Sequence, residues 1–126
     1  MDDMNFPKIE DFISAQIMDK EKALKRVQQK KELLNRVLTI FKKNLSEKKE
    51  TIKTDLAKKN WANLKLMAHG IKGSAWTIGA QQLGDVACAM EKAADNKNYP
   101  LYNHLFQILQ DCIERFLESE ELNSLL

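Results

Sequence analysis

A histidine, a lysine and two glycines lie close together in the segment Ala68-His-Gly-Ile-Lys-Gly-Ser-Ala75. Neutral imidazole is a nitrogen nucleophile near neutral pH. Lys72, about one helical turn after His69, can compensate the charge of an anionic group that approaches the ring. These residue types at this spacing are suited to phosphoryl transfer, with His69 as the acceptor and Lys72 stabilising the phosphoryl charge.

A helix from Trp61 to about Ile78 would turn His69 away from the protein core. At about 100° per residue, its apolar residues gather on one side, and His69 points almost opposite their centre. That apolar side consists of Leu64, Met67, Ala68, Ile71, Ala75 and Ile78. Gly70 and Gly73 each cost an exposed helix roughly 0.8–1 kcal/mol relative to alanine. They permit either close packing with a neighbouring helix or close approach of a large partner to the imidazole, and we favour the second interpretation.

Other residues of this helix are candidates for the same partner-binding surface. Leu66 and Lys65 precede His69 by about one turn, and Leu66 fits a small apolar rim for docking. Trp76 follows His69 by two turns, either as an exposed interface anchor or as a side chain folded over a neighbouring helix. Ser74 is predicted to point toward the bundle and to bond a carbonyl oxygen of the preceding turn.

Four amphipathic patterns with short connections must position this segment. The first begins near Lys31 and repeats apolar residues at spacings of three, four or seven. Its polar stretch at 46–49 indicates a bend or a break. Asn60 is a good N-cap for the second helix, and two more are predicted over Gln81 to Ala94 and Leu101 to about Leu122. The sequence therefore predicts an all-α fold, an antiparallel up-and-down four-helix bundle.

The N-terminal part is predicted to add one or two short helices. Residues 1–18 carry scattered apolar side chains and are expected to form an extension that packs on the bundle, which occupies residues 19–126. Asp19 can cap a short helix from Lys20 to Val27.

The composition limits the class of protein. With 126 residues, 44% of them hydrophobic, the chain is expected to form one domain with its own core. Only 4 glycines and 2 prolines favour long helices. A net charge of +2 does not indicate a nucleic-acid binder, and no apolar run approaches the ~20 residues of a membrane span. Cys88 and Cys112 lack a CxxC partner, so free thiols and a cytoplasmic location are expected.

No metal or haem site is predicted. His104 is the only other histidine, and the chain has no HxxxH or ExxH pair, so too few ligands are available. We assign no role to His104 and expect no cofactor.

The segment around His69 resembles the histidine-containing phosphotransfer (HPt) domain of multistep phosphorelays. That family's motif has an aliphatic residue two positions after the histidine, then Lys-Gly-Ser, a small residue, a Gly-Ala pair, a leucine and a distant glutamate. The corresponding positions here are His69, Ile71, Lys72-Gly73-Ser74, Ala75, Gly79-Ala80, Leu83 and Glu91. The resemblance covers roughly residues 19 to 120. Ile71 stands where leucine is more usual, and residues 1–18 fall outside the pattern.

The resemblance implies a phosphohistidine carrier without kinase machinery of its own. His69 would accept a phosphoryl group on Nε2 from the aspartyl phosphate of a receiver domain and pass it to the aspartate of another. The receiver would supply Mg²⁺ and the acidic pocket. The implied partners are receiver domains of response regulators or a hybrid sensor histidine kinase, and a monomer is expected.

Two alternatives stay open at this stage. A histidine kinase dimerisation domain also presents a histidine on a bundle, but it follows the histidine with an acidic residue and then a proline. Here His69 is followed by Gly70, and no proline follows until Pro100. A non-catalytic helical-bundle interaction module is the second alternative, and it would leave the exposed histidine with its Lys72-Gly73 neighbours unexplained.

Overall fold

Seven helices make up the computed structural model, which describes residues 6–126. They are α1 (Glu10–Ile13), α2 (Lys20–Arg26), α3 (Lys31–Lys58), α4 (Trp61–Thr77), α5 (Gln81–Asp95), α6 (Tyr99–Glu118) and α7 (Glu120–Asn123). No strand occurs in this part of the chain, so the prediction of an all-α fold is confirmed. None of the described helices combines the length and the apolar character needed to cross a bilayer.

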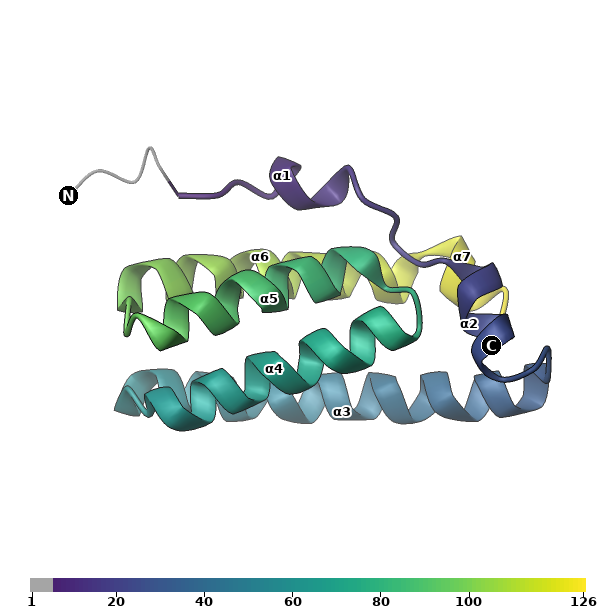
Figure 1. The fold of residues 1–126 in the computed structure, drawn as a ribbon, viewed down its shortest axis with the longest axis horizontal. Helices are drawn as coiled ribbons and strands as arrows, with labels where there is room; N and C mark the ends of the chain where they lie inside the picture. The colour runs from purple at the N-terminus through teal and green to yellow at the C-terminus, as the bar shows by residue number, and fades with distance from the viewer. Residues whose placement is uncertain (1–5) are drawn as a thin grey trace.

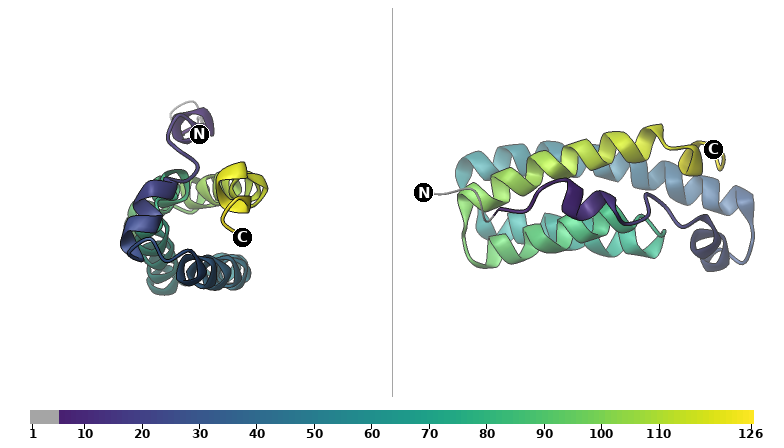
Figure 2. Two further views of the ribbon diagram at one scale, coloured as in Figure 1. Left: turned by 90° about the vertical axis from the view of Figure 1, so that its right-hand side faces the viewer. Right: turned by 90° about the horizontal axis from the view of Figure 1, so that it is seen from above.

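The four long helices α3 to α6 lie side by side, and each runs opposite to the one before it (Figure 1). Seen end on, they line one shared interior (Figure 2). Each contributes buried apolar side chains to this interior, among them Leu38 and Ile52, Leu64 and Ile71, Leu83 and Met90, and Leu105 and Leu109. Because one side of each helix is occupied in this way, the other side is left for polar residues.

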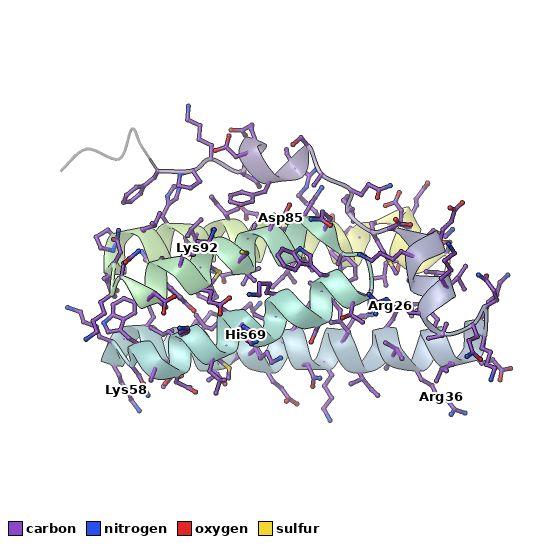
Figure 3. All side chains as sticks on the ribbon, viewed as in Figure 1. Arg26, Arg36, Lys58, His69, Asp85 and Lys92 are labelled. Carbon is purple, nitrogen blue, oxygen red and sulfur yellow. The ribbon has the colours of Figure 1, made fainter. Side chains whose placement is uncertain are left out.

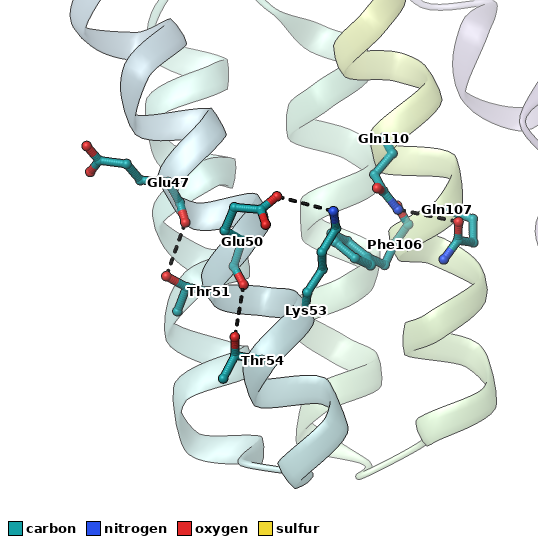
Figure 4. Close-up of polar contacts among 8 residues, drawn as sticks. All are labelled: Glu47, Glu50, Thr51, Lys53, Thr54, Phe106, Gln107 and Gln110. Carbon is teal, nitrogen blue, oxygen red and sulfur yellow. Dashed lines mark hydrogen bonds and ion pairs between the residues drawn. The ribbon is translucent and has the colours of Figure 1, made fainter.

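The long helix α3 continues through the polar stretch at 46–49, where the sequence predicted a bend or a break. Side chains around this stretch bond within the helix (Figure 4). Thr51 Oγ1 donates to the carbonyl of Glu47 at 3.1 Å. Lys53 Nζ lies 3.2 Å from the carboxylate of Glu50, one turn before it. The polar stretch is therefore part of one continuous helix and does not interrupt it.

Caps and a glycine turn fix the ends of α4. The Asn60 side chain accepts a hydrogen bond from the Asn63 N–H at 3.3 Å, which confirms the predicted N-cap. After α4, Gly79 has a φ of +77°, in the left-handed region that favours glycine. A Cβ there would lie 2.8 Å from the backbone oxygen of Asp19, whose N–H donates to the Gly79 carbonyl at 2.8 Å. Asp19 also caps α2, as predicted, by accepting from the Lys22 N–H at 3.0 Å.

The two ends of the chain differ in part from the predicted elements. The helix predicted over residues 101–122 is interrupted at Ser119, whose hydroxyl accepts from the Leu122 N–H at 3.2 Å and starts α7. Residues 6–18 run along α5 and α6 (Figure 1). Gln82 on α5 holds this segment by donating to the Ala15 carbonyl at 2.8 Å. Residues 1–5 of the predicted extension lie outside the described residues.

Candidate functional site

His69 lies midway along α4, on the side of the helix that faces away from the core (Figure 3). Its side chain is 62% exposed. Leu64, Ala68 and Ile71 of the same helix are buried. The orientation that the helical wheel predicts for His69 is therefore confirmed.

A carboxylate from the neighbouring helix contacts one nitrogen of this histidine. Glu91 on α5 has Oε2 2.9 Å from His69 Nδ1, and Lys72 Nζ donates to its Oε1 at 2.6 Å. The Glu91 side chain is only 15% exposed. The antiparallel packing of α5 on α4 thus joins His69, Lys72 and Glu91 into one cluster.

The three side chains of this cluster influence one another's charge. The hydrogen bond from Lys72, followed by that from His69, lowers the pKa of Glu91, although burial acts in the opposite direction. The same hydrogen bond to Glu91 raises the pKa of Lys72. At neutral pH, Glu91 is therefore an ionised carboxylate and Lys72 an ammonium.

The ionised carboxylate decides which nitrogen of His69 carries a proton. A carboxylate only accepts hydrogen bonds, so the contact with Glu91 requires an N–H at Nδ1. In the neutral ring the lone pair then lies on Nε2, which has no hydrogen-bond partner among residues 6–126. The geometry presents Nε2 of the neutral ring as an exposed nitrogen nucleophile.

The two glycines beside His69 have different surroundings. A Cβ at Gly73 would meet no atom within 4 Å, so the surface there is open, as predicted. A Cβ at Gly70 would lie 3.0 Å from Nζ of Lys48, which extends from α3. The space above Gly70 is therefore occupied by a lysine side chain of the same chain, and the partner-binding role of Gly70 stays a prediction.

An open groove of about 530 Å³ runs between α3 and α4 and reaches His69. Its lining includes Val37, Ile40 and Asn44 from α3 and His69, Gly73 and Thr77 from α4. Ile40 is 59% exposed, so a large apolar side chain in contact with water borders the groove.

Ser74 also lines this groove and is exposed, whereas the sequence predicted that it points toward the bundle. The adjacent residues Ile71 and Ala75 are the ones that fill the interior at this level. The buried side of α4 is therefore narrower than the wheel indicates.

Trp76 packs on α5, which is the second of the two alternatives left open by the sequence. It is half-buried, and a Cβ at Gly84 of α5 would overlap its indole ring. The indole Nε1 donates to Asp85 Oδ1 at 3.2 Å. The missing side chain at Gly84 makes room for the ring against the neighbouring helix, and the partner-binding role of Trp76 stays a prediction.

Leu66 and Lys65, the other predicted partner-binding residues, are both exposed. Leu66 is 59% exposed. Lys65 Nζ lies 2.6 Å from Asp95 Oδ1 in an ion pair at the surface, a kind of contact that contributes little to stability. The partner-binding role of both residues stays a prediction.

Three residues near His69 were not assigned to the site from the sequence. Glu91 was noted only as a position in a motif, and neither Lys48 nor Ile40 was noted near the histidine. All three lie on helices that pack beside α4. The sequence shows only that they are polar or apolar residues on the outer face of those helices. That signal does not tell which faces meet.

The rest of the described chain offers no competing site of the same kind. Within residues 6–126, no group of three or more His, Cys, Asp or Glu side chains is arranged to hold a metal ion. Cys88 and Cys112 are both free. His104 on α6 has Nε2 2.5 Å from the carbonyl oxygen of Pro7. Of the two histidines, only His69 has an available Nε2.

Comparison with known proteins gives one match. No curated protein and no solved structure matches the chain. The sequence profile of the Hpt domain matches residues 36–119, which is well over half of the chain. The matched part runs from α3 to the end of α6 and includes His69, Lys72 and Glu91. The chain therefore belongs to the Hpt domain family, whose members carry out histidine phosphotransfer in phosphorelays.

Proposed function

We propose that this chain is a cytoplasmic, monomeric phosphohistidine carrier of a two-component phosphorelay. His69 accepts a phosphoryl group on Nε2 from the aspartyl phosphate of one receiver domain and passes it to the aspartate of another. The supporting observation is the exposed Nε2, which holds the lone pair of the neutral ring because Glu91 accepts from Nδ1. The chain needs no kinase machinery, because the phosphoryl group arrives already activated.

The transfer is a displacement at phosphorus. The Nε2 lone pair attacks the phosphorus atom and the N–P bond forms. The P–O bond to the receiver aspartate breaks, and its electron pair leaves on the carboxylate. The ring becomes positively charged, because Nδ1 keeps its proton. Glu91, 2.9 Å from Nδ1, stabilises this charge.

Lys72 acts on the phosphoryl oxygens from the α5 side of His69. Its ammonium is held at 2.6 Å from Glu91, one turn from the histidine, and its flexible stem lets it turn toward the arriving group. Mg²⁺ is expected in the acidic pocket of the receiver. There it offsets the remaining negative charge of the transferred group.

The helices α3 to α6 are proposed to form an antiparallel up-and-down four-helix bundle. The receiver is proposed to dock on the outer side of α4 and on the groove between α3 and α4. Leu66 and Ile40 are both 59% exposed and would lose contact with water on docking. Gly73 leaves the surface near His69 open. Lys65 adds a charge at the rim, and Trp76 stays a predicted contact although it packs on α5.

Phosphotransfer from purified receiver domains of the same organism tests this proposal. The receivers are first phosphorylated with acetyl phosphate and Mg²⁺ and then mixed with the chain. We expect acid-labile, base-stable phosphate on the chain, loaded by one receiver and removed by another. A chain that no receiver phosphorylates, or one that acquires only acid-stable phosphate, would contradict the proposal and favour an interaction module.

A further inference from the structure

A second lysine approaches His69 from the side opposite to Glu91 and Lys72. Lys48 lies on α3, and its side chain crosses to α4, where a Cβ at Gly70 would lie 3.0 Å from Nζ and 3.5 Å from Cε. Gly70 is the direct chain neighbour of His69. The ammonium can lie against α4 at this level because Gly70 has no side chain.

The charge of Lys48 is not neutralised by the described part of the chain. No carboxylate of residues 6–126 forms an ion pair with it. The Lys72 ammonium, in contrast, is paired with Glu91 at 2.6 Å. Lys72 and Glu91 together therefore bring little net charge to an arriving phosphoryl group.

We infer that Lys48 is a second phosphoryl-binding residue, which contacts the oxygens of the group carried on Nε2 of His69. This inference rests on the proposed function. The phosphoryl dianion carries two negative charges, and the positively charged ring of His69 offsets only one of them, while Lys72 and Glu91 together are close to neutral. Lys48 supplies a positive charge from α3, and its four-carbon stem lets the ammonium move from above Gly70 toward Nε2.

Chemical phosphorylation tests this contact without a receiver. Phosphoramidate transfers its phosphoryl group to imidazole nitrogen, and ammonia leaves as the P–N bond breaks. The pKa of the phosphoryl group on His69 is then followed by ³¹P NMR over a pH titration. A nearby ammonium favours the dianion and lowers this pKa. Lys48→Met should therefore raise the proton affinity of the phosphoryl group roughly two- to threefold, as for a partly screened pair at about 5 Å.

Lys49→Met is the matched control. Lys49 lies on the side of α3 that faces α6, beside Ile113 and Leu117. The control removes the same charge from the next residue and keeps the apolar stem. We expect a change in proton affinity for Lys48→Met and none for Lys49→Met. Equal changes in both variants, or none in Lys48→Met, would overturn the inference.

The receiver reaction then separates this inference from the proposed function. Lys48→Met should slow transfer to His69 roughly three- to tenfold, and Lys49→Met should leave the rate unchanged. A wild-type chain that no receiver phosphorylates contradicts the proposed function, while the titration still tests the contact. A phosphorylated wild type with an equally fast Lys48→Met variant contradicts only the role of Lys48.

Discussion

His69 and His104 are the same residue type on two helices of one bundle, and their rings have opposite surroundings. Nε2 of His104 lies 2.5 Å from the carbonyl oxygen of Pro7, and its ring centre lies 5.3 Å from that of Phe6. A carbonyl oxygen only accepts hydrogen bonds, so Nε2 of His104 carries a proton and has no free lone pair. At His69 the acceptor is Glu91, it lies at Nδ1, and Nε2 is free. The acceptor beside each ring therefore decides which histidine can act as a nucleophile.

Replacing each histidine by glutamine should separate these two roles completely. His69→Gln should abolish phosphorylation and change the free energy of unfolding by no more than about 0.5 kcal/mol, because the side chain is exposed. His104→Gln should leave transfer unchanged and lower the free energy of unfolding by about 1 kcal/mol, because the bond to Pro7 is weakened or lost. Receiver phosphotransfer and thermal unfolding followed by circular dichroism measure both effects. Phosphorylation of the His69→Gln variant at His104 would contradict the comparison.

Glu91→Gln tests whether the acceptor at Nδ1 controls the nucleophile. An amide neither fixes the proton on Nδ1 nor offsets the positive ring that forms during transfer. Transfer to His69 should slow by about ten- to a hundredfold, the range typical for a group that orients a functional histidine.

The control for this variant is Asp95→Asn, about one turn further along α5. It removes the exposed ion pair with Lys65 and should change the transfer rate by no more than about twofold. If both variants slow transfer equally, Glu91 acts only through its general charge and not through the proton on Nδ1.

Local signals were sufficient to predict the long helices and the outward orientation of His69. Periodic apolar residues and a cap such as Asn60 act within one helix, so the sequence alone reveals them. The polar stretch at 46–49 was misinterpreted, because polar residues are compatible with the outer side of a long helix as well as with a break.

Contacts between helices could not be predicted in the same way. Glu91 meets His69 only because α5 packs on α4, and Lys48 reaches Gly70 only because α3 lies on the other side. The burial of Trp76 depends on the missing side chain of Gly84, 8 residues later in the sequence and on another helix. These distances are properties of packing and leave no periodic signal in one sequence.

Gly73 and Gly84 differ in the space around them: a Cβ at Gly73 would lie in open space, whereas a Cβ at Gly84 would meet the ring of Trp76. Gly84→Ala should lower the free energy of unfolding by about 1–3 kcal/mol, because its Cβ would overlap Trp76. Gly73→Ala has open space and should raise it by up to about 1 kcal/mol. Gly73→Gln should keep the fold and slow transfer about tenfold, because the longer side chain stands where the receiver is proposed to dock.

Thermal unfolding and transfer rates on the same samples decide these outcomes. Unfolding of Gly73→Gln would show that this glycine serves packing within the bundle. A stable Gly73→Gln variant with a normal transfer rate would contradict the proposed docking surface.

The smallest expected effect is the pH dependence of the Glu91 contacts. Lys72 and His69 lower the pKa of Glu91 in the folded chain below the ordinary carboxyl value of about 4.5. The unfolded chain therefore binds this proton first, and acid favours unfolding. The wild-type chain should have a higher free energy of unfolding than Glu91→Gln, by less than about 1 kcal/mol. This difference should be fully present above about pH 4.5 and should disappear as the pH falls through the folded-state pKa of Glu91. Urea unfolding at several pH values measures this difference, and a gap that widens in acid would contradict the assigned ionisation.

The position of the N–P bond tests the central claim most directly. The ¹⁵N-labelled chain is phosphorylated by a receiver, and the imidazole nitrogens are observed by NMR, where coupling to ³¹P identifies the nitrogen that carries the group. We predict a single N–P bond, at Nε2 of His69, with a proton on Nδ1 toward Glu91. Phosphorus on Nδ1 of His69, or on either nitrogen of His104, would contradict it.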